Sequence, residues 1–135
     1  MKSLVVDASV LVAAAIDGGP VGQWAEEILL RGNLAAPHLA PAEVTNVLRR
    51  AVLAGRVPEI VARSALQDLS RLDLELFPFA PFSPRVWQLR STLTAYDAWY
   101  VALAEGLKGS LATLDGRLVA ASGPRCRFLV PPADE

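Results

Sequence analysis

Four acidic residues are the side chains in this sequence that could do chemistry together. Asp7 follows a short apolar run, Glu43 opens a helical pattern, Asp97 lies in the first turn of another, and Asp115 precedes a glycine. Carboxylates that converge repel one another, and a hard divalent cation such as Mg2+ or Mn2+ offsets that repulsion because it prefers oxygen ligands. Such an ion suits phosphodiester hydrolysis, since it lowers the pKa of a bound water and stabilises the charge that develops on the phosphate.

Each acid also has a purely structural interpretation. Asp7 is placed as a helix N-cap, Glu43 as a first-turn acid favoured by the helix dipole, Asp97 as half of a capping box with Thr94, and Asp115 as the start of an Asp-Gly turn. Any one of these explanations is adequate alone. Four such residues at the same edge of one sheet would favour a shared site instead.

Other catalytic classes lack the residues they need. The only histidine is His38 and the only cysteine is Cys126, so neither a Ser/His/Asp set nor a Cys/His set is available, and a disulfide or Cys-rich metal site is excluded. With 13 basic and 14 acidic residues, the net charge is −1 and gives no global case for nucleic-acid binding. Any contact with nucleic acid must be local. Eleven of the 13 basic residues are arginine, which suits bidentate contact with phosphate.

Short apolar runs alternate with helical patterns along the chain. The sequence predicts strands over 3–6, 34–36, 73–79, 110–113 and 127–130, the third at a sheet edge because it contains Pro78. Helices are predicted over 8–16, 21–31, 40–50, 58–72, 85–92 and 93–105, with a short one after 115–116. In the helix 58–72, Ile60, Ala65, Leu66 and Leu69 are predicted to face inward.

This alternation indicates a mostly parallel, five-stranded sheet with helices on both faces, a three-layer α/β/α sandwich. In such sheets ligands bind beyond the carboxyl ends of the strands. Asp7 ends the first strand, Glu43 opens the helix after the second, Asp97 follows the third by way of an extra helix, and Asp115 lies just past the fourth. We therefore expect the four acids to converge at the carboxyl ends of the strands.

The length of 135 residues predicts a single domain over 1–135. The first apolar stretch contains Asp7, and the uninterrupted run over 10–16 is too short to span a bilayer, so a soluble, cytoplasmic protein without membrane association is expected. A single cysteine fits a reducing compartment. The hydrophobic content of 53% indicates that a partner covers some apolar surface.

Four segments of the sequence resemble the four motifs of the PIN-domain ribonucleases. They are Val5-Val6-Asp7-Ala8-Ser9, Pro41-Ala42-Glu43-Val44-Thr45-Asn46-Val47-Leu48, Thr94-Ala95-Tyr96-Asp97-Ala98-Trp99-Tyr100 and Leu111-Ala112-Thr113-Leu114-Asp115. The resemblance covers essentially the whole chain, and the segment 94–98 is its most specific part. Within that superfamily the chain most resembles the toxin half of VapBC-type toxin-antitoxin pairs.

The resemblance implies a PIN-like fold and Mg2+- or Mn2+-dependent endonucleolytic cleavage of RNA. It implies that Asp7 and Asp97 ligate the metal directly, and that Glu43 and Asp115 complete the catalytic site directly or through water. Ser9 and Thr113 match hydroxyl positions near the site that orient a ligand or a metal-bound water; the alternative is that a serine in a first helical turn and a threonine in a strand have structural roles only. The resemblance also implies inhibition by a cognate antitoxin and a homodimer bound by that antitoxin.

Two arginines are candidates for contact with RNA phosphates. Arg90 precedes the Asp97 helix and Arg117 follows Asp115. The alternative is that each is a solvated side chain or forms an ion pair with an acid.

Two other function classes remain open from the sequence. A phosphoacceptor signalling domain has a similar size and sheet, but it needs an adjacent acid pair near the first strand and a lysine near the last. Here Ala8 and Ser9 follow Asp7, and Lys108 precedes the fourth strand. A catalytically silent partner-binding α/β domain, in which the acids are only caps, predicts no divalent-metal binding and a loss of about 1 kcal/mol for each cap removed.

Overall fold

A single five-stranded sheet organises the computed structural model, which describes residues 2–133. Its strands are β1 (Leu4–Val6), β2 (Leu34–Pro37), β3 (Leu74–Phe77), β4 (Ser110–Ala112) and β5 (Arg127–Leu129), in the order β3-β2-β1-β4-β5. Every neighbouring pair is parallel, so the predicted mostly parallel sheet is parallel throughout. The predicted edge position of the third strand is confirmed. Residues 1 and 134–135, which the single-domain prediction also includes, lie outside the described residues.

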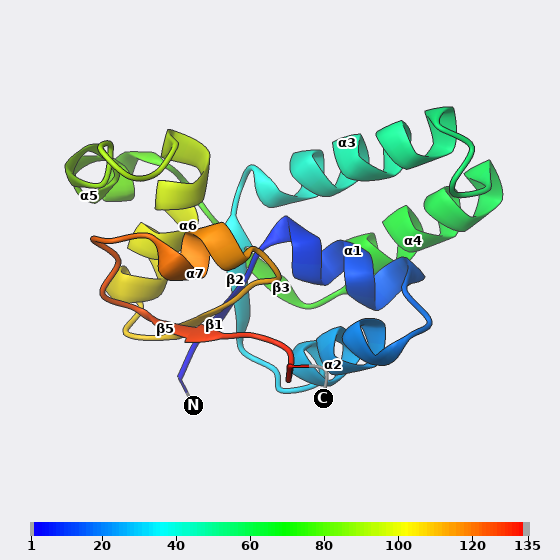
Figure 1. Ribbon diagram of the computed structural model, residues 1–135, viewed down its shortest axis with the longest axis horizontal. Coiled ribbons are helices and arrows are strands. Elements are labelled where there is room, and N and C mark those ends of the chain that lie inside the picture. The colour runs from blue at the N-terminus through cyan, green and yellow to red at the C-terminus, as the bar shows by residue number, and fades with distance from the viewer. Residues whose placement is uncertain (1, 134–135) are drawn as a thin grey trace.

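Helices form a layer on each side of this sheet. They are α1 (Ala8–Ile16), α2 (Pro20–Leu29), α3 (Ala40–Leu53), α4 (Glu59–Arg71), α5 (Ser83–Gln88), α6 (Ala95–Gly106) and α7 (Gly116–Ala120), with a 3-10 turn at Ala80–Phe82. Helices α1 to α4 gather on one side of the strands and α5 to α7 on the other (Figure 1). The predicted three-layer α/β/α architecture is confirmed. None of the helices within residues 2–133 combines the length and apolar content that crossing a membrane requires.

The central strands are buried because helices cover both of their faces. All three residues of β1 are buried, and Val5, Val6 and Leu111 are completely enclosed. A strand covered on both faces carries a continuous apolar run rather than an alternating one. Helix α6 packs against β1, β2 and β4 and contributes a buried run from Tyr100 to Ala104. The helix that carries Asp97 is thus fixed directly on the centre of the sheet.

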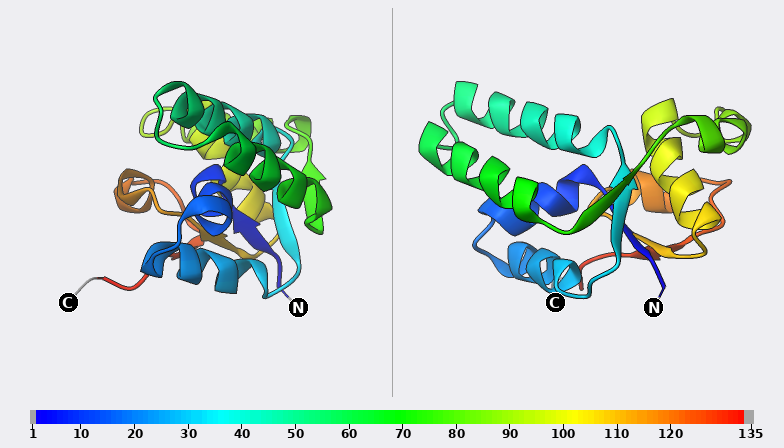
Figure 2. Two further views of the ribbon diagram at one scale, coloured as in Figure 1. Left: turned by 90° about the vertical axis from the view of Figure 1, so that its right-hand side faces the viewer. Right: turned by 180° about the vertical axis from the view of Figure 1, so that it is seen from behind.

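Helices α3 and α4 pack against each other as a helical hairpin and extend together beyond the sheet (Figure 2). The inward face of α4 consists of Ala62 and Ala65, with Leu66 and Leu69 packed against the core. The prediction for Ile60 was wrong, because its side chain is 71% exposed. Ala62 and Ala65 lie on the face of α4 that packs against the core. Ile60 lies in the first turn of the helix, on the opposite, outer face.

The strand order places a topological switch point at the centre of the sheet. From β1 the chain moves outward to β2 and β3, then returns to add β4 and β5 on the other side of β1. Ligands of open parallel sheets bind outside the carboxyl ends of the strands at such a point. The residues that follow β1 and β4 are Asp7 and Thr113, and they flank this position.

Candidate active site

Asp7 is the most buried of the four acids, with 8% of its surface exposed. It follows β1 and is the N-cap of α1, where Oδ1 accepts a hydrogen bond of 3.3 Å from the backbone N–H of Val10. The hydroxyls of Ser9 and Thr113 also donate to its carboxylate, Ser9 to Oδ1 and Thr113 to Oδ2. The predicted cap is therefore real, and it coexists with a carboxylate held on both oxygens.

Backbone N–H groups set the direction of these two hydroxyls. Ser9 Oγ accepts from the backbone N–H of Leu114 at 3.1 Å, and Thr113 Oγ1 accepts from that of Asp115 at 3.0 Å. Because each hydroxyl accepts from the backbone, its proton is free to point at Asp7. The loop after β4 is thereby tied to the start of α1. The structure thus places both predicted hydroxyl residues against the Asp7 carboxylate.

Glu43 lies in the first turn of α3 and is partly buried. The phenol of Tyr100, on α6, donates a hydrogen bond of 2.6 Å to its Oε1. Tyr100 is itself 2% exposed, so this bond connects two helices across the core. Sequence reasoning missed the contact, since the two residues are 57 positions apart and a buried tyrosine on a helix gives no sign of its partner.

Asp97 and Asp115 both lie at helix starts. Asp97 is in the first turn of α6, where its backbone N–H donates to Thr94 Oγ1 at 3.2 Å, the first half of the predicted capping box. Asp115 is the N-cap of α7 and accepts from the backbone N–H of Arg117 at 3.0 Å. Asp115 is the most solvent-exposed of the four acids, whereas Asp97 is partly buried.

The four acids share one electrostatic field. Burial is the main cause that raises the pKa of the Asp7 carboxyl, and it outweighs the hydrogen bonds from Ser9 and Thr113. Burial also raises the pKa of Glu43, against the bond from Tyr100, and the charges of Asp97 and Asp7 raise it further.

Asp97 closes this series of interactions. Its pKa is raised by burial and then by the negative charge of Asp115. Asp7, Glu43, Asp97 and Asp115 are thus linked by successive like-charge repulsion. The four acids are thus near enough for the charge of each to act on at least one other, and among residues 2–133 none of them forms an ion pair with a basic side chain.

The family model of the PIN domain matches residues 4–124, which include all four acids. The chain belongs to the PIN-domain family. The matched span runs from β1 through α7 and ends before β5.

Individual relatives agree with this assignment. Ribonuclease VapC1 of Mycobacterium tuberculosis is 45% identical to this PIN domain over 129 residues, covering 91% of this chain and 97% of that protein. The crystal structure of PAE2754 from Pyrobaculum aerophilum superposes with a TM-score of 0.69 at 25% identity, covering 94% of this chain and 89% of the other. VapBC2 from Rickettsia felis, solved bound to a DNA fragment from its promoter, has the same fold, with a TM-score of 0.67 at 13% identity and coverage of 94% and 97%.

The two arginines predicted to contact phosphate do not pair with the acids of this PIN domain. The Arg90 guanidinium lies 4.5 Å from the ring centroid of Trp87 and donates to the Trp87 carbonyl at 2.9 Å. Arg117 is exposed on α7. Within residues 2–133, no ion pair joins an arginine or lysine side chain to any of the four acids. Contact of either arginine with RNA stays a prediction.

The donor set of the PIN domain fits a hard divalent cation. Among residues 2–133, no three His, Cys, Asp or Glu side chains are grouped closely enough to hold an ion by themselves. Mg2+ does not require such a cage, because it commonly binds through one or two carboxylates and keeps several waters. Burial and like charges disfavour the ionised forms of Asp7, Glu43 and Asp97, and no basic side chain among residues 2–133 pairs with them, so a bound cation would supply the positive charge that offsets this cost.

Proposed function

We propose that this PIN domain is a Mg2+- or Mn2+-dependent endoribonuclease that acts as the toxin of a toxin-antitoxin pair. The observation that carries the proposal is the set of four mutually repelling acids at the switch point of the sheet, without a basic partner. The 45% identity to a protein named a ribonuclease supports RNA as the substrate. Neither a silent partner-binding domain nor a phosphoacceptor domain needs four acids in one field.

In this proposal Asp7 and Asp97 hold the metal directly, and Glu43 and Asp115 complete the site. The bound ion would supply an activated water and stabilise the charge of the phosphodiester in the transition state. Ser9 and Thr113 orient the Asp7 carboxylate through the two hydroxyl bonds described above. Tyr100 fixes the position of Glu43 through its hydrogen bond to Oε1.

A groove beside the site provides a place for the antitoxin. It has a volume of about 340 Å3 and lies among α1, α2, α3 and α4. Its apolar lining includes Leu11, Leu29, Leu30, Val44 and Leu69, and its acidic members are Glu26 and Asp68. We propose that an antitoxin segment with apolar side chains and basic neighbours fills it.

The proposal also includes a single domain over 1–135, a cytoplasmic location and a homodimer. The homodimer is proposed from the family resemblance, and large apolar side chains that could take part in it lie exposed outside the groove. These are Leu53, Ile60, Val61, Leu76, Phe79, Trp87, Tyr96 and Val130. An apolar side chain left in water favours association, because burial in an interface removes it from solvent.

The nuclease is tested with purified, antitoxin-free protein and total cellular RNA in Mg2+, Mn2+ or EDTA. We expect cleavage with either ion, none in EDTA, and none with Asp97→Asn. Asp73→Asn is the matched control, because Asp73 is an exposed acid in the loop before β3. If folded wild-type protein cuts no RNA, or if Asp97→Asn cuts as well as Asp73→Asn, the nuclease assignment fails and the partner-binding domain replaces it.

The antitoxin groove is tested with the protein encoded beside this chain in its genome. Leu30 is 85% exposed in the groove, and Leu53 is 71% exposed outside it, so neither change to glutamate disturbs the core. We expect Leu30→Glu to cut RNA normally and to escape neutralisation, whereas Leu53→Glu stays neutralised. Equal neutralisation of both variants would place the antitoxin elsewhere.

A further inference from the structure

A cavity lined by charged residues lies at the opposite end of the strands from the four acids. It has a volume of about 410 Å3, and its lining includes Lys108, Arg125, Cys126 and Arg127. Lys108 precedes β4 by two residues and Arg127 is the first residue of β5. Because these strands are parallel, the cavity is at their amino ends, whereas Asp7 and Asp115 lie beyond the carboxyl ends.

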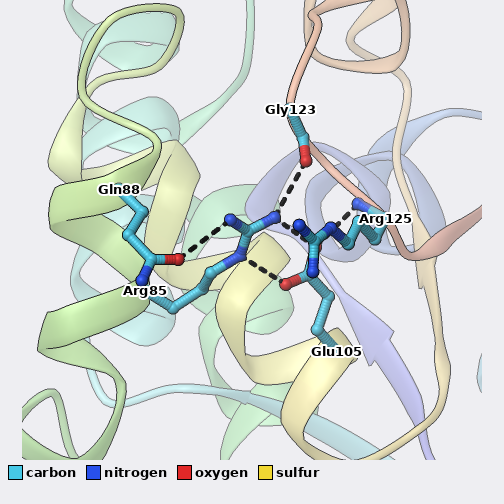
Figure 3. A network of polar contacts seen from close by, with 5 residues as sticks. All are labelled: Arg85, Gln88, Glu105, Gly123 and Arg125. Carbon is cyan, nitrogen blue, oxygen red and sulfur yellow. Dashed lines mark hydrogen bonds and ion pairs between the residues drawn. The ribbon is translucent and has the colours of Figure 1, made fainter.

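The one acid of the cavity lining is already neutralised. Glu105 accepts from Arg85, with Nε 2.7 Å from Oε1 and Nη2 3.2 Å from Oε2, and its Oε2 also accepts from the backbone N–H of Arg125 at 2.7 Å (Figure 3). Arg85 is held further by the carbonyl of Gly123 at 2.8 Å. Glu105 is thereby committed to Arg85 on both carboxylate oxygens.

Positive charge in the cavity is therefore in excess. Within residues 2–133, the side chains of Lys108, Arg125 and Arg127 form no ion pair. Arg125 is near enough for its charge to act on Glu105, but that carboxylate already has its partner. Three cations thus surround one cavity in a chain whose net charge is −1.

The backbone of Lys108 has a conformation that glycine adopts more easily than lysine. Its φ is 54°, in the left-handed region that favours glycine after the end of a helix. The next residue, Gly109, passes so close to the backbone of Ser3 that a Cβ would lie 2.1 Å from the Ser3 carbonyl oxygen. Position 109 therefore requires glycine for its contact with Ser3, whereas glycine at position 108 would be less strained than the lysine that is present.

We propose that Lys108, Arg125 and Arg127 bind a phosphate group in this cavity. Arginine guanidinium groups form paired hydrogen bonds with phosphate oxygens, and a lysine adds a mobile point charge. The phosphate comes either as a small ligand, inorganic or on a mononucleotide, or as a phosphodiester of an RNA chain. The site is separate from the acidic edge and does not depend on the nuclease assignment.

Cys126 makes the site directly measurable, because it lines the cavity and is the only cysteine in the chain. The experiment follows Cys126 alkylation by iodoacetamide, read by mass spectrometry, together with calorimetric binding. The probes are inorganic phosphate, adenosine 5′-monophosphate and a short uridine oligomer, each in EDTA and compared with chloride at equal ionic strength. We expect binding with protection of Cys126 by at least one probe, and the probe that binds most tightly identifies the source of the phosphate.

Two variants test the residues. Arg125→Gln combined with Arg127→Gln is expected to weaken binding by tenfold or more and to abolish protection, since two charge-assisted contacts are lost. Arg31→Gln combined with Arg56→Gln, a matched change at exposed arginines in other turns, should bind as wild type does. Lys108→Gly is expected to weaken binding while the midpoint of thermal unfolding stays equal or rises, which separates loss of the ligand contact from loss of the fold.

Three results would overturn the proposal. The first is that no probe binds more than chloride does. The second is that binding survives in the Arg125 and Arg127 double variant. The third is that RNA binds without protecting Cys126, which places the polymer at another surface.

Discussion

The phenol of Tyr100 donates a 2.6 Å hydrogen bond to Oε1 of Glu43, which joins the helix of one proposed catalytic acid to that of another. Tyr100 lies one turn after Asp97 on α6, and Glu43 is in the first turn of α3. The bond favours the ionised form of Glu43, whereas burial and the charges of Asp97 and Asp7 disfavour it. The position and the proton affinity of Glu43 both depend on this contact.

Removal of the phenol is expected to shift the pH dependence of cleavage. In Tyr100→Phe, Glu43 loses the contact that lowers its pKa, so its pKa rises and the acid limb of the pH–rate profile moves to higher pH. The expected loss of stability is about 1–3 kcal/mol, because a hydrogen bond to a charged, partly buried group is lost. The profile is measured by RNA cleavage at saturating Mg2+, beside Tyr96→Phe, whose side chain is 61% exposed. An unchanged profile in Tyr100→Phe would mean that Glu43 does not ionise in the reaction.

Local patterns in the sequence were sufficient to predict the elements and the placement of the acids. Apolar runs ending in an acid, and capping residues such as Thr94 before Asp97, mark the starts of strands and helices without knowledge of the partners. Since the elements alternate, the parallel sheet and the shared edge follow from topology. The cap predicted at Asp7 is present, and Asp115, which was predicted to start an Asp-Gly turn, is the N-cap of α7, so a structural role and proximity to the other acids hold together.

Contacts between distant residues could not be predicted in this way. Nothing in the sequence pairs Tyr100 with Glu43 or Arg85 with Glu105, because such contacts depend on how helices pack after the sheet has formed. The inward prediction for Ile60 failed for the same reason. Helical spacing identifies a stripe of residues, whereas the neighbouring helices decide which side of the stripe is buried.

The hydroxyl of Thr113, rather than the shape of its side chain, is expected to be essential for RNA cleavage. Its side chain is fully buried, donates to Asp7 and accepts from the backbone N–H of Asp115. Thr113→Val keeps the volume but leaves two buried polar groups without this partner, which is expected to cost about 1–3 kcal/mol and most of the RNA cleavage. Thr113→Ser keeps the hydroxyl and should retain activity. Urea unfolding and cleavage rates measure both effects, and equal activity of the two variants would contradict the positioning role.

Asp97→Asn is expected to stabilise the folded protein while it abolishes cleavage. The folded-state pKa of Asp97 is raised by burial and then by the charge of Asp115, so its ionised form is disfavoured by folding. An acid with a raised folded pKa destabilises the fold at neutral pH, and that cost disappears as the pH falls through the raised pKa. Relief of the repulsion is expected to be worth at most about 1 kcal/mol for a partly exposed charge.

The same variant separates metal binding from charge relief. If Mg2+ binds the folded site and not the unfolded chain, as the proposed function requires, it should raise the unfolding midpoint of the wild-type protein in a concentration-dependent way. Asp97→Asn should start from a higher midpoint in EDTA and respond less to Mg2+. Calorimetric scans at neutral pH measure both, and a Mg2+ response as large as that of the wild type would exclude Asp97 as a ligand.

The ion pair between Arg85 and Glu105 is expected to contribute to stability above the acid range only. Burial alone would raise the pKa of Glu105, but the hydrogen bonds from Arg85 and from the Arg125 backbone outweigh it and lower that pKa below its ordinary value of 4.5. An acid with a lowered folded pKa stabilises the fold above its ordinary pKa, and this contribution is lost as the pH falls through the lowered value.

Both side chains of the Arg85–Glu105 pair are largely buried, with 23% and 17% exposed, so Glu105→Gln should cost about 1–3 kcal/mol at pH 7. Glu59→Gln is the matched control, because its pair with Arg63 is 61% to 65% exposed and should contribute less than about 0.5 kcal/mol. Urea unfolding at pH 7 and near pH 3 measures the loss of stability in each variant. The loss in Glu105→Gln should be smaller at the lower pH. An equal loss at both pH values would show that packing of the glutamate, rather than its charge, stabilises the fold.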